Sequence, residues 1–211
     1  MPRRSRLASL VFVVLVFCAS GAFGRDKPTL KLDRHDLTVL GVTIGSSTQT
    51  DVESSLGKAE VFGVGSGDAR ENAICYRSPS TEEDTIVVFY FGALGGWTDV
   101  TRTSISKSRA LPWPSTRCKS NPSVSRTLEF LRELKLGSAA PDVIRALGPP
   151  SLSSKNRLYY YTSHHCEPGS GEKAERGEPS RDSPCEAVDS VEAKFDSQGG
   201  LIYMSFYHFV D

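Results

Sequence analysis

Two short amphipathic segments of the chain share one pattern of apolar, glycine and polar positions. In residues 44–57 an aliphatic-Gly pair leads into a small polar turn, an Asp-Val pair and a closing Leu-Gly, and residues 136–148 repeat this order. Apolar residues four positions apart, such as Val52 and Leu56, lie on one face of a helix. Each segment therefore predicts a short helix that packs one apolar side, and the two copies together indicate a tandem repeat.

The ends of these helices are also marked in the sequence. Thr50 and Glu53 have the Thr-x-x-Glu spacing of a capping box, in which each side chain binds the backbone N–H of the other residue. Pro141 suits the first turn of the second helix, where a missing N–H is tolerated. Upstream of the second copy, the apolar spacing of residues 124–137 predicts a further helix that ends at a glycine. The lead-in to the first copy, residues 37–44, is compatible with a strand or a helix.

After each predicted helix the pattern changes to short strands rich in β-branched and aromatic residues. They are expected at residues 73–77, 85–91 and 97–105 in the first half and at 158–161, 191–195 and 201–206 in the second. Residues 63–67 are expected to form a glycine-rich connection, and residues 167–186 a long hairpin loop with almost nothing to bury. The sequence thus predicts an α+β fold of two tandem repeats. Each repeat is a short helical segment or helix pair followed by a three- to four-stranded antiparallel meander.

The N-terminus has the three parts of a secretory signal peptide. Three arginines precede an apolar run, and small residues before Gly24 provide a cleavage site. A membrane anchor is the alternative, but the apolar run is shorter than the roughly 20 residues that span a bilayer. A lipid anchor on Cys18 is disfavoured because a phenylalanine precedes this cysteine. Cleavage is therefore expected after Gly24, which predicts a secreted or periplasmic protein.

Composition divides the whole chain into five expected segments. The segments expected are a signal peptide at 1–24, a flexible tail at 25–36, the first repeat at 37–108, a linker at 109–123 and the second repeat at 124–211. The linker is rich in proline and serine. Trp113 and Cys118 within it indicate that it is held down on the rest of the molecule.

The charge balance argues against one class of partner. The whole chain carries 25 Lys and Arg against 25 Asp and Glu, and removal of the leader lowers the basic count to 22 and gives a net charge of −3. Nucleic-acid binding draws its affinity from phosphate neutralisation by Lys and Arg. No nucleic-acid partner is therefore expected, and the mature chain contains no predicted transmembrane segment.

The cysteines are consistent with export. Without Cys18 of the leader, four remain, an even number for an oxidising compartment. Four cysteines allow three pairings, and the favoured one joins Cys75 to Cys118 and Cys166 to Cys185, because it staples each repeat once. A cysteine and histidine metal site is the alternative, but the chain has no Cys-x-x-Cys pair, and adjacent ligands at 164–166 crowd one another.

The sequence contains no recognisable catalytic constellation. The four histidines, His35, His164, His165 and His208, are not accompanied by a serine or cysteine nucleophile in a familiar setting. Cysteines joined in disulfides would be inert. We therefore expect a protein that is not an enzyme and has no cofactor or metal.

The helix pattern Gly-x-x…Asp-Val-x-x-x-Leu-Gly, the tyrosine-rich strand and the Phe-x-x-x-Gly-Gly strand pair together carry a resemblance. They resemble the domain of the small outer-membrane assembly lipoproteins of the BamE or SmpA/OmlA type and, in tandem, the β-lactamase inhibitor protein family. The resemblance covers most of residues 37–207 and implies a helix followed by a β meander in each repeat. It implies a protein-binding role, and it transfers no site residue.

The function expected is a secreted or periplasmic, non-catalytic module that binds another protein or scaffolds the cell envelope. The alternative is a soluble inhibitor of a secreted hydrolase. Three consecutive tyrosines, Tyr159, Tyr160 and Tyr161, cannot all face the same side of a strand, so at least one is expected on the surface. Together with Trp97 they are the candidate protein-binding residues, because exposed aromatic side chains anchor interfaces.

Overall fold

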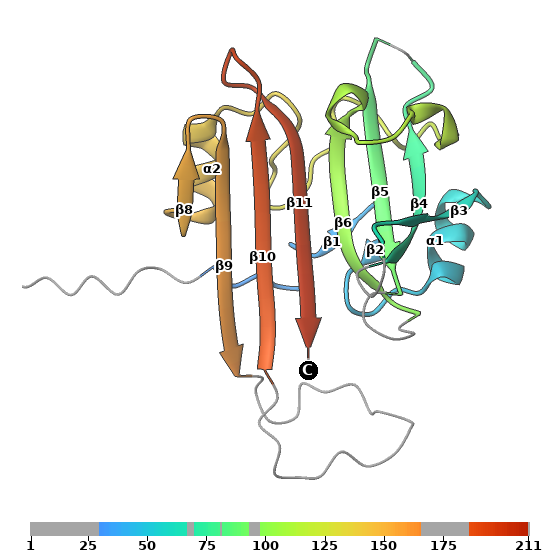
Figure 1. Ribbon diagram of the computed structural model, residues 1–211, viewed down its shortest axis with the longest axis horizontal. Coiled ribbons are helices and arrows are strands. Elements are labelled where there is room, and N and C mark those ends of the chain that lie inside the picture. Colours follow the sequence, from blue (N-terminus) through green and yellow to red (C-terminus); the bar gives the residue numbers. More distant parts are fainter. Residues whose placement is uncertain (1–29, 67–69, 81, 93–97, 166–185, 211) are drawn as a thin grey trace, which may run out of the picture.

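The computed structural model describes residues 30–66, 70–80, 82–92, 98–165 and 186–210. The expected signal peptide, Trp97 and the expected Cys166–Cys185 bond lie outside these residues. The described chain is an α+β structure with one large antiparallel sheet and two α-helices (Figure 1).

The elements follow one another in a similar order in the two halves. The first half contains β1 (Thr38–Val39), β2 (Val42–Thr43), α1 (Gln49–Leu56), β3 (Val61–Val64), β4 (Glu71–Arg77), β5 (Thr85–Phe91), β6 (Val100–Lys107), the 3-10 turns η2 (Ser108–Ala110) and η3 (Ser115–Arg117), and β7 (Lys119–Ser120). The second half contains α2 (Ala140–Leu147), β8 (Leu152–Ser154), β9 (Arg157–His165), β10 (Glu186–Phe195) and β11 (Leu201–Val210).

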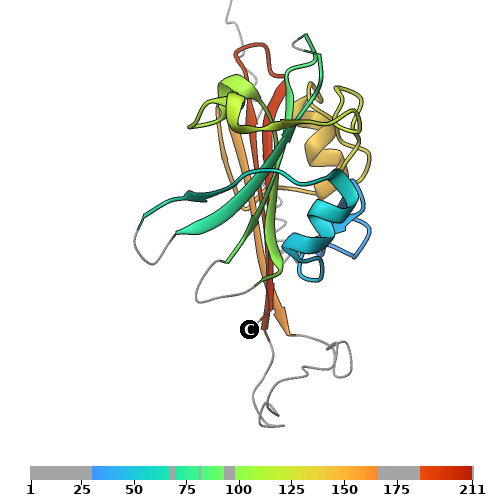
Figure 2. The ribbon, with the colours of Figure 1, turned by 90° about the vertical axis from the view of Figure 1, so that its right-hand side faces the viewer.

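The large sheet joins both halves through their last strands. Its order is β3-β4-β5-β6-β11-β10-β9-β8, with β7 pairing in parallel with β4. At the centre β6 and β11 are antiparallel, with Ser106 opposite Tyr203 and Arg102 opposite Tyr207. Both helices lie on the same side of the sheet, as Figure 2 shows. We call this side the helix face and the opposite side the outer face.

The main core lies between the helices and the helix face. Val52 and Leu56 of α1 and Val143 and Leu147 of α2 are buried there, which confirms the predicted apolar sides of both helices. The strands contribute large side chains from both halves: Tyr76, Phe89, Tyr160 and Phe206, all almost fully buried. One continuous core therefore spans the β6–β11 pairing.

The cap of the first helix lies two residues before the predicted one, at Thr48. Thr48 has extended backbone, and its hydroxyl accepts the N–H of Asp51, whose carboxylate accepts the N–H of Thr48 at 2.8 Å. These hydrogen bonds lower the pKa of Asp51. The predicted capping box of Thr50 and Glu53 is therefore wrong, because an equivalent box two residues earlier, formed by Thr48 and Asp51, already satisfies free donors of the helix end.

The helix predicted over residues 124–137 is absent, and this segment is a series of turns. Its residues 131–133 all have positive φ angles, and the N–H of Phe130 donates to the carbonyl of Leu134 at 2.8 Å. Left-handed backbone cannot belong to a right-handed helix. The apolar spacing correctly indicates burial, since Leu131 and Leu134 lie in the core. It does not indicate a helix.

The tail expected at 25–36 is an ordered part of the fold from residue 30 onward. Leu30 and Leu32 are each 6 % exposed and belong to the main core. The guanidinium of Arg132 holds the carboxylate of Asp36 and also donates to the carbonyl of Lys31 at 2.8 Å. The prediction failed because the two leucines are separated by polar residues, so their burial depends on partners distant in sequence.

All six predicted strands are present, and most are longer than predicted. The expected glycine-rich connection at 63–67 begins within β3, and the short edge strand β8 was not anticipated. The undecided lead-in at 37–44 contains a small hairpin of β1 and β2. Each half therefore supplies one α-helix and four strands of the main sheet path.

Candidate functional site

The outer face of the sheet is closed in one half of the molecule and open in the other. Figure 1 looks onto this face, with both helices behind the strands. Cross-strand pairing assigns its side chains, because alternate residues of a strand point to opposite faces. The covered half, on β3, β4 and β5, consists of Phe62, Ala73, Cys75, Ile86, Val88 and Tyr90.

A disulfide-tethered segment lies over the covered half. After β6 the chain passes through η2 and η3, which lie over the upper ends of β4, β5 and β6 in Figure 1. Cys118 is bonded to Cys75 of β4 with a Cα–Cα distance of 4.7 Å, as favoured from the sequence. We call residues 108–118 the strap. It overlaps the linker expected at 109–123, and its last residue is bonded to the sheet.

The strap contributes one large aromatic side chain. The Trp113 ring lies edge-on to Phe62 at 5.7 Å and to Tyr90 at 6.5 Å, between ring centres. The guanidinium of Arg117 lies 4.4 Å from the centre of the Phe62 ring. The six sheet side chains of the covered half are each at most 5 % exposed. Strap and sheet therefore form a second, smaller core.

The corresponding surface on β8 to β11 has no strap within the described residues. This open half contains the aromatic side chains of Tyr159, Tyr161, Tyr203, Tyr207 and Phe209. Tyr161 is 52 % exposed, whereas Tyr203 is only 8 % exposed. The rings of Tyr207 and Phe209 stack at 6.3 Å. Aromatic side chains on an uncovered sheet surface are the usual anchors of protein interfaces.

A salt bridge marks the border between the halves. Arg102 of β6 is paired with Glu71 and lies 3.8 Å from the centre of the Tyr90 ring. Desolvation is the largest influence on Glu71 and raises the pKa of its carboxyl, although Arg102 opposes this shift. The border is therefore polar but already partly withdrawn from water.

At the outer edge of the open half the surface is hollowed. A cavity of about 400 Å³ is lined by Leu152, Ser153, Ser154, Arg157, Tyr159 and Glu192. Leu152, on edge strand β8, is 69 % exposed, the most exposed large apolar side chain of the described chain. This edge socket combines an apolar wall with an ion pair between Arg157 and Glu192 at 3.0 Å.

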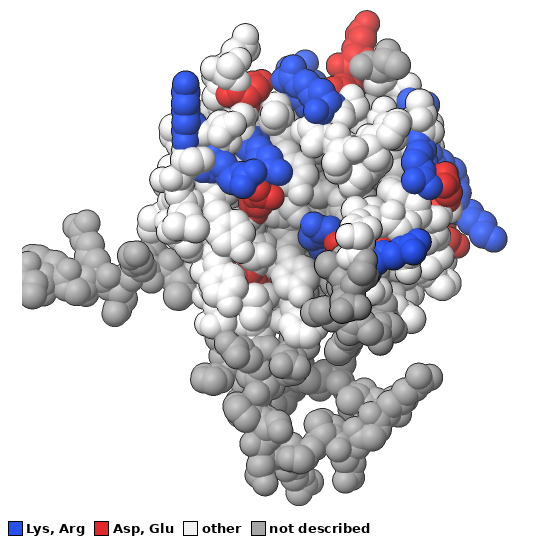
Figure 3. Space-filling model, in the orientation of Figure 1, with Lys and Arg blue, Asp and Glu red and all other residues white. Residues whose placement is uncertain are grey.

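Charge is unevenly distributed over the open half. Figure 3 shows basic side chains gathered at the upper left, over the adjoining ends of β8, β9 and β10, with acidic side chains among them. Below them the surface over β9 to β11 is largely uncharged. The open half therefore has a basic end and an aromatic end.

The predicted binding residues are only partly brought together. Tyr159 and Tyr161 lie on the open half, but Tyr160 points to the helix face and is 1 % exposed. Tyr160 is thus a core residue and not a contact for a partner, because strand alternation separates it from its neighbours. Sequence reasoning missed Leu152, Tyr207 and Phe209, although the alternation of aromatic residues along 203–209 was visible.

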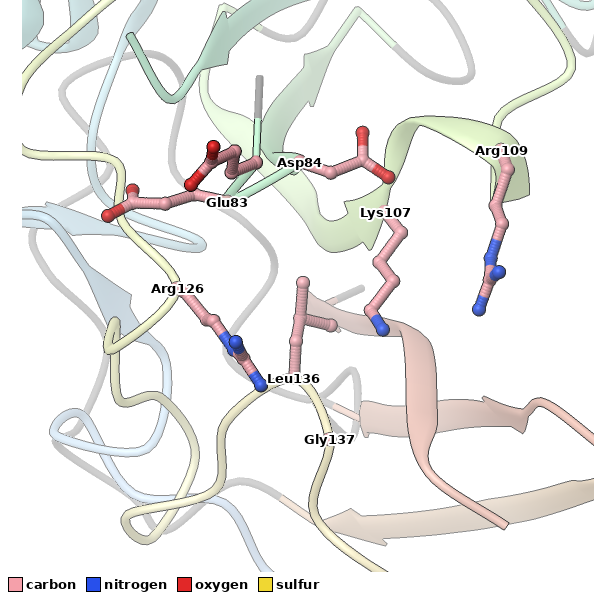
Figure 4. Close-up of a pocket in the computed structure, with 8 residues that line it drawn as sticks. Glu83, Asp84, Lys107, Arg109, Arg126, Leu136 and Gly137 are labelled. Carbon is pink, nitrogen blue, oxygen red and sulfur yellow. The ribbon is translucent and has the colours of Figure 1, made fainter. Parts of the chain in front are cut away.

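A second pocket lies at the junction of the two halves (Figure 4). Its volume is about 260 Å³, and Leu136 and Gly137 form its apolar part. Three acidic and three basic side chains surround it: Glu82, Glu83, Asp84, Lys107, Arg109 and Arg126. Asp84 accepts the N–H of Ser108, and Arg109 is bound to Asp196. Equal numbers of both charges favour no particular ligand.

One Asp–His pair lies on the helix face. Asp189 is fully buried, and one of its oxygens lies 2.7 Å from Nδ1 of His208. Gly45 leaves room for the imidazole, since a Cβ there would lie 3.0 Å from its ring. Among the described residues, no hydroxyl or thiol is hydrogen-bonded to His208, whose partner is Asp189.

One further cluster has potential metal ligands. Asp33, His35 and Asp36 bring ligand atoms within 4.8 Å of one another, the only such group in the described part of the chain. The Asp36 carboxylate is bound by Arg132, and Asp33 and Asp36 accept each other's backbone N–H. These contacts account for the cluster as a turn that is anchored by an arginine.

Comparisons with known protein families, with curated proteins and with solved structures find no match to this chain. Both α-helices of the described ranges are eight residues long, and none of the helices there is long and apolar enough to cross a membrane. The Cys75–Cys118 bond is compatible with an exported protein.

Proposed function

We propose that the chain is a secreted or periplasmic, non-catalytic module that binds another protein of the cell envelope or exterior. The observation that carries this proposal is the open half of the outer face. A fold that covers one half of a sheet face with its own strap leaves the other half uncovered among the described residues, with exposed Tyr161 and Leu152. Exposed aromatic and aliphatic side chains on a rigid sheet form the centre of an interface at little entropic cost.

We also propose that the two halves are tandem copies of one BamE-like unit. Each half has the order of one helix followed by four strands, and the final strands β6 and β11 adjoin at the centre of the sheet. The shared helix pattern of residues 44–57 and 136–148 supports the same origin. Such an arrangement suits a binding protein, because it produces one wide sheet from two small units.

Inhibition of a secreted hydrolase is the alternative function. It uses the same open half, since an inhibitor of this type blocks an enzyme by covering its active-site entrance. The two functions differ in their readout. An inhibitor lowers the activity of a purified β-lactamase or protease at nanomolar concentration, whereas a scaffold binds without changing turnover.

The test uses the mature chain from residue 25 onward as bait for exported proteins of its native host. Tyr161→Ala is the test variant because it removes an exposed ring, and Ile144→Ala is the matched control. Ile144 is 39 % exposed and lies on α2, on the other side of the sheet. Crosslinking followed by mass spectrometry identifies what is bound.

The expected result is a specific partner that Tyr161→Ala loses and that Ile144→Ala retains. The loss is expected to be about tenfold or more in affinity, as for a central interface tyrosine. Equal recovery by both variants would exclude the open half as the binding surface. Inhibition of a hydrolase that is lost in parallel would establish the alternative function.

A further inference from the structure

We infer that the partner presents a large apolar side chain next to one or more carboxylates, and that these groups bind at the edge socket. This inference rests on the proposed function, since it specifies the chemistry of the protein bound by the open half. It is carried by the arrangement of Leu152, Tyr159, Arg157, Glu192 and Lys194.

The basic groups at the socket exceed their acidic partner. Arg157 Nε and Lys194 Nζ both lie near the same oxygen of Glu192, at 3.0 and 3.5 Å. Two cations therefore share one carboxylate, and their side chains remain 55 % and 33 % exposed. Lys155, in the turn that joins β8 and β9, is exposed as well. The socket thus carries a local positive charge on a molecule whose mature chain is slightly acidic.

The socket as a whole is large enough for one bulky side chain. Leu152 and Tyr159 face each other across the β8–β9 pairing, and the cavity beside them measures about 400 Å³. A single aromatic or branched aliphatic group that enters the socket would bury the exposed Leu152, and removal of this apolar surface from water favours binding. The neighbouring cations would then lie beside the entering residue.

A protein fits this arrangement better than a lipid does. The tyrosines that continue along the surface offer hydroxyl groups as well as rings, which suits the polar backbone of a protein loop. Partly exposed cations at the rim of an apolar site accelerate association with an acidic partner and select against basic ones. We therefore assign the charge at the socket to partner selection.

The test selects peptides of random sequence, displayed on phage, on the immobilised full mature chain. The variant Arg157→Gln/Lys194→Gln removes the excess charge, and Arg126→Gln/Lys135→Gln is the matched control outside the open half. Tyr161→Ala reports on the open half itself. Selected peptides are then synthesised, and their affinities are measured at 50 and 300 mM salt. Vesicles of phosphatidylglycerol provide a parallel lipid probe.

The expected peptides contain Asp or Glu beside Phe, Tyr, Trp, Leu or Ile. Their affinity is expected to fall about tenfold in the Arg157→Gln/Lys194→Gln variant and with added salt, and to be unchanged in the control. Peptides without acidic residues that still lose binding in Tyr161→Ala would overturn this inference but leave the proposed function intact. Failure to select any peptide that depends on Tyr161 would overturn both. Binding of vesicles alone, dependent on Arg157 and Lys194, would replace the protein partner by an anionic lipid.

Discussion

The covered and open halves of the outer face share one sheet but differ in what lies on it. In the covered half, Ile86 and Val88 of β5 are sealed beneath the strap. In the open half, the strand at the matching distance from the centre is β10, and it presents Glu192 and Lys194 instead. The side chains on each half therefore suit their surroundings. Uncharged residues are found beneath the strap, whereas the uncovered half also presents charged residues such as Glu192 and Lys194.

This difference suggests separate roles for the two halves of the outer face. A strap makes the first half a stabilised support, with a small core of its own. The absence of such a cover among the described residues of the second half leaves a surface for other molecules. The comparison predicts that damage to the covered half reduces stability, whereas damage to the open half reduces binding.

Removal of the disulfide is expected to have the largest effect. The Cys75–Cys118 bond closes a loop with a sequence separation of 43 residues. The variant Cys75→Ala/Cys118→Ala should lose about 4 kcal/mol of unfolding free energy, because the unfolded chain regains the entropy of that loop. Urea unfolding measures this loss. An unchanged midpoint would show that the strap is held by its other contacts alone.

Replacement of Trp113 should have a smaller effect on stability. Trp113→Ala removes the ring between Phe62 and Tyr90 and is expected to cost about 2 to 3 kcal/mol, less than for a fully buried tryptophan. The counterpart Tyr161→Ala, on the open half, should cost no more than about 0.5 kcal/mol. Thermal unfolding of the two variants side by side tests the contrast. Similar losses would contradict the division into a structural and a binding half.

Alkaline pH is expected to weaken the covered half through Tyr90. Burial raises the pKa of its phenol to about 12. Between pH 10 and 12 the phenol ionises in the unfolded state but remains protonated in the folded state. The contribution of Tyr90 to the free energy of unfolding is therefore fully present below pH 10 and is lost as the pH rises through that range. The contribution of Tyr90 is on the order of 2 kcal/mol. Tyr90→Phe should reduce the slope of unfolding free energy against pH. An identical slope would assign the effect to Tyr76 and Tyr160, whose pKa values are also about 12.

The strands and the two helices were predictable because local patterns determine them. Residues 85–91 form β5 as expected, and Val52 and Leu56 define the buried side of α1. The turns at 124–137 were not predictable, because three left-handed residues interrupt a spacing that suits a helix. The burial of Leu30 and Leu32 could not be predicted from the sequence either, because it depends on contacts with residues distant in the chain.

The candidate surface was only partly predictable. Alternation assigned opposite faces to Tyr159 and Tyr160, but it could not say which face the helices would cover. That choice depends on the packing of α1 and α2 on the strands. The edge socket also required the structure, because β8 and β10 contribute to it from separate parts of the chain.

The position of β11 has a consequence for biogenesis. This strand is the last in chain order, yet it lies in the middle of the sheet beside β6. While the chain is being synthesised, β6 therefore presents an unpaired edge until residues 201–210 are available. Contacts so distant in sequence slow folding, and an open strand edge invites pairing with other chains. The nascent protein should consequently depend on chaperones for a longer period than its size alone would suggest.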